Sequence, residues 1–214
     1  YLEKFGLFEK MPVEIKEVGK PIIPKPWLPI NTITIGYGYG ISISPLHLCS
    51  IYAAMVNGGL LKDLTFLKRS KEQFSERVIK EKTSFKVREF LRAVVLETEW
   101  TGPRARVLGY EVGGKTGTAE IIKNKQYNKK ENLSSFIGVF PISKPKYIVL
   151  VMIENPKEIA ETYNNTTGAW VAAPAVASII KHMVNILGIT PISEKINLKV
   201  KHNNFNFREF NSAT

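Results

Sequence analysis

The sequence predicts an α/β fold of the α+β type, in which helices pack against a single antiparallel sheet. Three strand-like apolar segments follow one another between residues 112 and 153, and their connections are short enough for antiparallel pairing. Apolar residues with helical spacing occur on both sides of this stretch. With 214 residues, the chain is long enough for one domain with its own core.

The first 35 residues are predicted to form an extended connector that wraps over a surface. Four prolines exclude a long helix from this part of the chain, namely Pro21, Pro24, Pro26 and Pro29. Residues 36–40 alternate glycine with tyrosine and predict a flexible loop.

Three helices are predicted after this loop. In the first, Ser44 is the N-cap, Pro45 lies in the first turn, and a glycine pair ends the helix after Asn57. The second covers residues 83–98 and is followed by a break at residues 101–103. The third is strongly apolar, covers residues 169–187 and ends at Gly188. The apolar side of the second helix is predicted to consist of Phe85, Phe90, Leu91, Val94 and Val95.

The predicted strands cover residues 112–122, 134–141 and 147–153. Residues 143–146 contain Pro145 and suit the turn of a hairpin between the last two strands. Residues 159–167 are polar and predict a loop. Residues 191–214 are rich in lysine and asparagine, and they are predicted to form a basic, loosely ordered tail.

The charge and the apolar pattern argue against two classes of function. The net charge is +11, but the lysines are scattered. Their local clusters at residues 123–130 and 195–201 lack the arginines and interleaved aromatic residues of a nucleic-acid motif, so we expect no nucleic-acid partner. The longest apolar run, residues 148–153, is too short to span a membrane, and the pattern of the first residues does not predict a signal peptide.

The single cysteine, Cys49, excludes an intramolecular disulfide and a cysteine-rich metal site. Cys49 lies in an apolar helical stretch, so we expect a buried, unreactive thiol. The histidines His47, His182 and His202 are far apart in the sequence and are interpreted as structural or surface residues rather than ligands. We therefore expect neither a metal nor a cofactor.

One motif points to chemistry, and it consists of Lys115, Thr116, Gly117 and Thr118 at the start of a predicted strand. A strand edge presents backbone N–H groups at fixed spacing, and a glycine allows a substrate backbone to approach closely. The lysine adds positive charge and the two threonines add hydroxyl donors, which together predict a receptor for a carboxylate or an oxyanion. The alternative is a glycine-rich turn that leads into a strand with a solvated lysine.

Further segments around this motif carry a resemblance to a known family. The motif K-T-G is one signature of penicillin-binding proteins and serine β-lactamases. Residues 37–46, YGYGISISPL, are similar to a Y-G-x-G segment of the class B transpeptidases, with His47 where that family usually has glutamine. Residues 109–120, 135–141 and 168–174 resemble the K-T-G strand, the next strand and the run into the final helix. The resemblance covers residues 1–190 and is closest to the septal, division-specific type.

The resemblance implies the C-terminal part of a transpeptidase domain with the serine β-lactamase/transpeptidase-like fold. That fold has a five-stranded sheet, of which this chain supplies three strands. In the family, a serine attacks the D-Ala-D-Ala amide of a peptidoglycan stem peptide, and the acyl group passes to an amine of a neighbouring stem. A β-lactam mimics the donor and is trapped.

The resemblance also implies roles for single residues. Lys115 polarises the site and holds the terminal carboxylate together with the hydroxyls of Thr116 and Thr118. The N–H of Thr118 forms one arm of an oxyanion hole. Tyr37 and Tyr39 are candidates for lining the substrate groove, with packing as the alternative role. Trp170 is expected to be an anchor in the core or at the groove edge.

The implied partners are peptidoglycan stem peptides, β-lactams, division-machinery proteins and the missing N-terminal half of the transpeptidase domain. The implied location of the parent protein is the periplasmic face of the bacterial inner membrane.

The residues that start the family's catalysis are not found before the K-T-G motif. The first 114 residues contain neither S-x-x-K nor S-x-N. Ser178 and Ser143 each stand three residues before a lysine, and residues 163–165 match Y-x-N, but all of them follow the motif. We therefore expect the isolated chain to be inactive. It could be an expressed fragment, a split-gene product or a decayed gene, and a scaffold module or a basic nucleic-acid-binding domain are the alternative functions.

Overall fold

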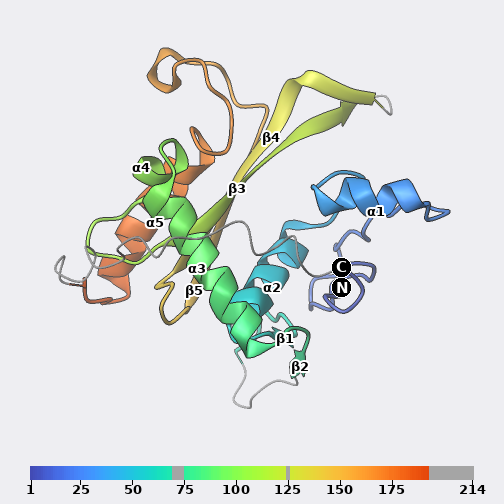
Figure 1. Ribbon diagram of the computed structural model, residues 1–214, viewed down its shortest axis with the longest axis horizontal. Helices are drawn as coiled ribbons and strands as arrows, with labels where there is room; N and C mark the ends of the chain where they lie inside the picture. The colour runs from blue at the N-terminus through green and yellow to red at the C-terminus, as the bar shows by residue number, and fades with distance from the viewer. Residues whose placement is uncertain (69–74, 124–125, 193–214) are drawn as a thin grey trace, which may run out of the picture.

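The central element is a three-stranded antiparallel sheet with the strand order β3-β4-β5, which confirms the predicted fold class. In the computed structural model, which describes residues 1–68, 75–123 and 126–192, the strands are β3 (Gly113–Lys123), β4 (Gln126–Phe140) and β5 (Tyr147–Glu154). Because β4 begins at Gln126 rather than at residue 134, β3 and β4 form a long hairpin that extends beyond α3 and α5 (Figure 1).

Helices cover both faces of this sheet (Figure 1). Helix α5 (Ala172–Ile186) packs on β4 and β5. It approaches β4 closely at Gly138, where a Cβ atom would lie 2.6 Å from Val176 Cγ1. Helices α2 (Pro45–Val56) and α3 (Glu81–Glu97) supply the side chains that cover the other face. A sheet covered on both faces explains why β5 is apolar along most of its length instead of alternating with polar residues.

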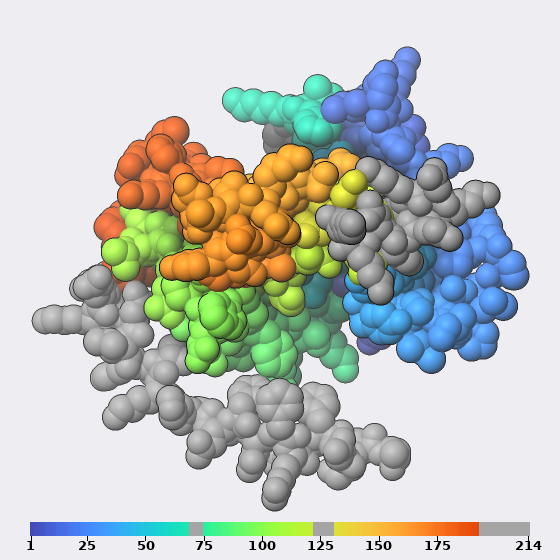
Figure 2. Space-filling view, turned by 90° about the horizontal axis from the view of Figure 1, so that it is seen from above, coloured from blue at the N-terminus to red at the C-terminus, as the bar shows by residue number. Residues whose placement is uncertain are grey.

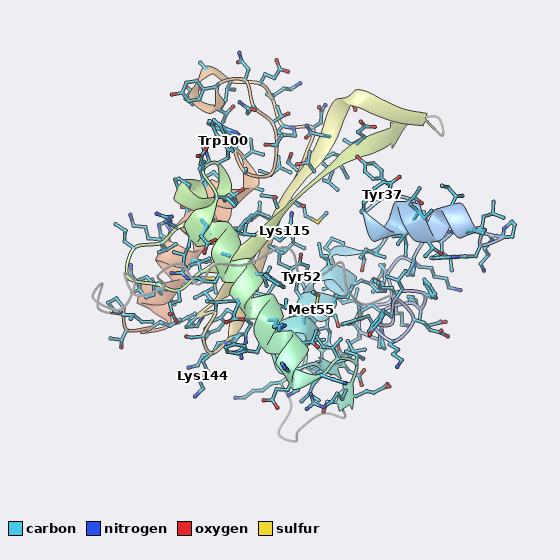
Figure 3. The ribbon with its side chains drawn as sticks, in the orientation of Figure 1. Tyr37, Tyr52, Met55, Trp100, Lys115 and Lys144 are labelled. Atoms are coloured by element: carbon cyan, nitrogen blue, oxygen red, sulfur yellow. The ribbon has the colours of Figure 1, made fainter. Side chains whose placement is uncertain are left out.

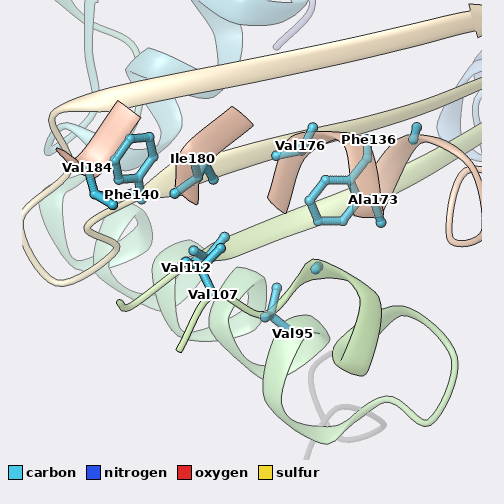
Figure 4. Close-up of a cluster of buried hydrophobic side chains, with 11 residues drawn as sticks. Val95, Val107, Val112, Phe136, Phe140, Ala173, Val176, Ile180 and Val184 are labelled. Carbon is cyan, nitrogen blue, oxygen red and sulfur yellow. The ribbon is translucent and has the colours of Figure 1, made fainter. Parts of the chain in front are cut away.

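Two buried clusters lie on opposite faces of the sheet. Successive side chains of a strand point to opposite faces, so Phe140 of β4 belongs to one cluster and Val139 to the other. The second cluster joins Val139 to Val56 of α2 and Leu91 of α3. The first cluster joins the sheet and α5 to Val95 of α3 and to Ala105 (Figure 4). It consists of Val95, Ala105, Val107, Val112, Phe136, Phe140, Ala172, Ala173, Val176, Ile180 and Val184.

The predicted helix boundaries are confirmed to within a few residues. Ser44 is the N-cap of α2, and its Oγ accepts a hydrogen bond from the His47 N–H at 3.4 Å. Helix α3 begins at Glu81, two residues before the predicted start at residue 83. Helix α5 ends just before Gly188, which has a φ of +62°. The polar loop before α5 contains a single 3₁₀ turn, η1 (Ala160–Thr162).

The predicted apolar side of α3 is only partly correct. Leu91 and Val95 are buried, but the side chains of Phe85 and Phe90 are 53% and 52% exposed. The buried stripe runs through Ser84, Leu91 and Val95. Phe85 and Phe90 each lie one position from a member of this stripe, which is a rotation of about 100° around a helix with 3.6 residues per turn.

Two short helices form where the sequence analysis predicts extended chain or a break. Helix α1 (Pro29–Gly36) begins with its proline in the first turn, and the Asn31 side chain accepts the Leu28 N–H at 2.7 Å. Helix α4 (Thr101–Ala105) contains Pro103. Both prolines are tolerated because the N–H groups of a first helical turn have no partner within the helix.

A small two-stranded sheet, β1 (Leu60–Lys62) with β2 (Ser75–Arg77), was not predicted. Its three-residue strands are too short to show a period in the sequence. Within the three described ranges, no helix is both long and apolar enough to cross a bilayer. All but residues 191 and 192 of the predicted tail lie outside the described residues.

Candidate functional site

The motif Lys115–Thr118 lies in β3, which is an edge strand of the sheet. β4 pairs with one side of β3, and within the described ranges no other strand pairs with its second side. The side chains of Lys115 and Thr118 are exposed, and Thr116 is half-buried. The Lys115 Nζ donates to the carbonyl of Thr116 at 2.9 Å and lies 3.4 Å from its Oγ1. The motif therefore presents a cation, two hydroxyls and an open backbone edge.

Glycines allow β3 to approach its neighbours closely. A Cβ atom at Gly114 would lie 2.6 Å from the Ile137 carbonyl oxygen and closer still to the Phe136 ring. A Cβ atom at Gly113 would meet Ile142 at 2.8 Å. The glycine pair before the motif is thus required by packing between β3, β4 and the segment after β4.

An arginine from α3 fixes the chain where it enters β3. The Arg92 Nη1 donates to the Val112 carbonyl at 2.6 Å. Burial lowers the pKa of the Arg92 guanidinium, and the Glu111 carboxylate opposes that shift. Helix α3 is thereby tied to the residue directly before the strand that carries the motif.

The Thr118 hydroxyl contacts the loop that precedes α5. The N–H of Gly168 donates to Thr118 Oγ1 at 3.2 Å. Asn132 Nδ2 donates to Thr166 Oγ1 at 2.9 Å, and the buried Ser134 donates to the Thr166 carbonyl. Sequence reasoning did not identify these loop and β4 residues, because their polar side chains carry no spacing that relates them to the motif.

Trp170 lies at the centre of a group of aromatic and basic side chains beside this loop. The Arg104 guanidinium stacks on the Trp170 ring, with its Cζ 3.3 Å from the centroid, and the rings of Tyr163 and Trp100 lie 5.5 and 6.1 Å away. In Figure 2 the segments around α4 and before α5 lie next to each other on one face. Trp170 is half-buried, so it anchors a surface cluster rather than the interior of the core.

Tyr37 and Tyr39 lie in the loop that follows α1, away from the motif's own strand. Figure 3 shows Tyr37 at the end of α1. Their rings are 5.9 Å apart and inclined by 58°. Tyr37 is 65% exposed and Tyr39 is half-buried, so neither is a core residue. The contacts of the motif described above come from β3, β4 and the loop before α5, and they do not include these tyrosines.

His47 has a structural role, as predicted. It is buried, its Nε2 lies 2.9 Å from the Glu9 carbonyl, and its Nδ1 lies 2.7 Å from Ser44 Oγ. Since a carbonyl only accepts hydrogen bonds, Nε2 carries the proton and Nδ1 accepts from the serine. His182 is exposed on α5, and His202 lies outside the described residues. Cys49 is half-buried, and burial raises the pKa of its thiol.

The serines that match S-x-x-K by spacing lie outside β3, the strand that carries the motif. Ser178 is an exposed residue within α5, and its carbonyl lies 2.7 Å from His182 Nδ1. Ser143 lies in the turn after β4, where its carbonyl accepts from Arg88 at 2.8 Å. An activated nucleophile needs a base within hydrogen-bond reach of its hydroxyl, and among the described residues neither serine hydroxyl contacts one.

Comparison with known proteins gives consistent results for sequence and structure. The profile described as penicillin binding protein transpeptidase domain matches residues 1–181. The chain is 34% identical to the probable peptidoglycan D,D-transpeptidase FtsI of Caulobacter vibrioides over 92% of its length, and 34% identical to stage V sporulation protein D of Bacillus subtilis over 95%. It spans only 35% and 32% of these two relatives.

Solved structures agree with these relatives. The transpeptidase domain of penicillin-binding protein 3 from Burkholderia pseudomallei superposes with a TM-score of 0.78 at 30% identity, covering 89% of this chain and 57% of that one. Penicillin-binding protein 3 from Mycobacterium tuberculosis, solved in complex with ampicillin, gives a TM-score of 0.76 at 26% identity, covering 89% of this chain and 46% of that one. The chain belongs to the penicillin-binding protein transpeptidase domain family.

Proposed function

We propose that this chain carries the carboxylate- and oxyanion-binding strand of a peptidoglycan D,D-transpeptidase. The observation that carries the proposal is the position of Lys115–Thr118 on the open edge of β3, with the cation and one hydroxyl exposed. A peptide laid along this edge places its terminal carboxylate near Lys115, Thr116 and Thr118. Charge-assisted hydrogen bonds of this kind are roughly twice as strong as neutral ones.

The proposed reaction of the parent enzyme is acyl transfer through a serine. The serine oxygen attacks the carbonyl between the two D-alanines, the terminal D-alanine leaves, and an amine of a second stem peptide then takes the acyl group. The Thr118 N–H stabilises the negative oxygen that forms during attack. β-Lactams are proposed to enter the same site, and neither a cofactor nor a metal takes part.

The chain itself supplies recognition but no nucleophile. It contains no S-x-x-K or S-x-N before Lys115, and the serines that match by spacing lie in α5 and in the turn after β4. We propose that the serine comes from transpeptidase-domain sequence outside this chain, with the parent protein acting at the periplasmic face of the inner membrane among division proteins. A scaffold without catalysis is the alternative function.

Binding of acetyl-D-Ala-D-Ala to the chain tests the proposal. In an NMR titration, the dipeptide should shift the amide signals of residues 115–118. Lys115→Ala should weaken binding roughly tenfold, because it removes a charge-assisted hydrogen bond. Lys144→Ala is the matched control, since Lys144 is an exposed lysine in the turn between β4 and β5. Equal effects of the two substitutions, or no shift at residues 115–118, would contradict the proposal.

A further inference from the structure

Gly168 joins the first turn of α5 to the side chain of Thr118. Its N–H donates to Thr118 Oγ1 at 3.2 Å. Its carbonyl accepts from the N–H groups of Ala172 and Ala173, at 3.2 and 2.9 Å. A single residue therefore connects the strand that carries the K-T-G-T motif to the helix that covers the sheet.

No side chain fits at Gly168. A Cβ atom there would lie 2.8 Å from the Gly117 carbonyl oxygen and closer still to that of Ser135. Both obstacles are backbone atoms of paired strands, so they cannot rotate away as a flexible side chain would. Any larger residue must push the loop off the sheet and lengthen the hydrogen bond to Thr118.

The same loop is held from its other side by β4. Ser134, which is fully buried, donates to the Thr166 carbonyl and lies 3.0 Å from Asn132 Oδ1. Asn132 Nδ2 donates to Thr166 Oγ1 at 2.9 Å. These contacts fix the chain two residues before Gly168, and they limit how far the Gly168 N–H can move.

The hydrogen bond from Gly168 decides what the Thr118 hydroxyl can still do. A threonine hydroxyl has one proton to donate and two lone pairs to accept with. The Gly168 N–H occupies one lone pair, and among the residues that the structure describes none accepts the hydroxyl proton. Because threonine is stiff at χ1, a fixed Oγ1 also fixes the region into which that proton points.

We infer that Gly168 is a positioning residue that holds the Thr118 hydroxyl as a donor for an anionic acceptor, supported by Ser134 and Asn132. This inference rests on the proposed function, in which the acceptor is the terminal carboxylate of a D-Ala-D-Ala peptide. It adds that the loop before α5 sets the selectivity of the motif for a carboxylate over an uncharged end.

The test compares two probes on the full chain by NMR titration, acetyl-D-Ala-D-Ala and its C-terminal amide. The wild type should prefer the acid. Gly168→Ala should reduce affinity for the acid roughly tenfold and change affinity for the amide little, which a merely structural defect would not do. Gly19→Ala is the control, because a Cβ atom there has no neighbour within 4 Å.

A double-substitution cycle shows whether Gly168 acts through Thr118. Thr118→Val should lower the preference for the acid at least as much as Gly168→Ala does, while Lys115 retains the rest, and adding Gly168→Ala to Thr118→Val should have no further effect. Thr118→Ser should retain the preference, because it keeps the hydroxyl. Ser134→Ala, which loosens the loop without altering Gly168, should lower the preference partially and covers the case in which Gly168→Ala does not fold.

Three results would overturn the inference. A preference for the acid that stays as large as in the wild type in both Gly168→Ala and Ser134→Ala shows that the loop does not position the hydroxyl. Additive effects of Gly168→Ala and Thr118→Val show that Gly168 acts elsewhere. A wild type that binds neither probe at residues 115–118 contradicts the proposed function and removes this inference with it, so the two failures are distinguishable.

Discussion

Gly58 and Gly59 share a backbone conformation but differ in their surroundings. Their φ angles are +97° and +92°, which side chains disfavour. A Cβ atom at Gly58 would have no neighbour within 4 Å, whereas one at Gly59 would lie 2.9 Å from the Ile79 carbonyl carbon. We expect Gly59→Ala to lower the free energy of unfolding by about 1–3 kcal/mol more than Gly58→Ala, the usual cost of overpacking. Urea unfolding of both variants measures the difference, and equal losses would show that no clash exists.

The thiol of Cys49 and the phenol of Tyr52 make stability depend on pH in the alkaline range. Burial raises the pKa of both groups in the folded state, so the folded state holds these protons more tightly than the unfolded state. Their contribution is complete below the unfolded pKa values, about 8.5 for cysteine and about 10 for tyrosine, and is lost as pH rises through the folded values.

Replacing the thiol isolates its share of this effect. Cys49→Ala should lose less stability than the wild type when urea unfolding is repeated at pH values above about 8.5. The same variant should show no such advantage at neutral pH. If the free energy of unfolding falls equally with pH in both proteins, the Cys49 thiol has the same pKa in the folded and unfolded states.

At the scale of single elements, α2 depends on one serine for its start. Ser44 Oγ accepts the His47 N–H and lies 2.7 Å from the His47 ring. Ser44→Ala should cost about 1–2 kcal/mol in free energy of unfolding, as N-cap removal does, and Ser44→Thr should restore most of it. Ser42→Ala is a control on an exposed serine two residues away. If Ser44→Ala and Ser42→Ala unfold at the same temperature, the Ser44 side chain does not stabilise the start of α2.

Elements with a long periodic pattern could be predicted from the sequence, and short ones could not. The α2, α3 and α5 helices and the three main strands were found because their apolar residues repeat over several turns or pleats. Helices α1 and α4 were missed because proline was interpreted as a breaker, although both prolines lie in a first turn. β1 and β2, with three residues each, depend on pairing with each other rather than on a local pattern.

In the candidate site, contiguous residues could be predicted from the sequence and distant ones could not. The K-T-G-T motif is contiguous, so the sequence alone predicts Lys115 and Thr118 on one strand. Gly168 and Ser134 lie 50 and 16 residues further along the chain from Thr118, as their numbers show, and only the fold brings them to it. Hydrogen bonds between distant segments leave no spacing to recognise, and this is why the loop before α5 was interpreted simply as polar.

For the molecule as a whole, the outer edge of β5 is the main expected weakness. β4 pairs with one side of β5, and no strand in the described part of the chain pairs with the other. The strand Tyr147–Glu154 is apolar for most of its length, and long apolar edges promote association. The family resemblance implies a five-stranded sheet, and we expect its two other strands to pair with this edge.

Sedimentation velocity tests this expectation. The chain should self-associate with rising concentration or unfold without a sharp transition. Met152→Lys, a charge placed on an exposed position of β5, should reduce the association. Ile186→Lys adds the same charge at the exposed end of α5 and should not. A strictly monomeric wild type with a sharp thermal transition would show that another part of this chain covers the edge, and the candidate from sequence, residues 196–200, lies outside the described residues.

The central claim is that this chain holds the recognition strand of a penicillin-binding transpeptidase site without its nucleophile. Intact-protein mass spectrometry after incubation with a fluorescent penicillin tests it most directly. We expect an unchanged mass, because an acyl-enzyme requires an activated serine and none precedes the motif. A stoichiometric adduct would contradict the proposal, and peptide mapping of that adduct to Ser178 or Ser143 would identify a nucleophile outside the strand that carries Lys115.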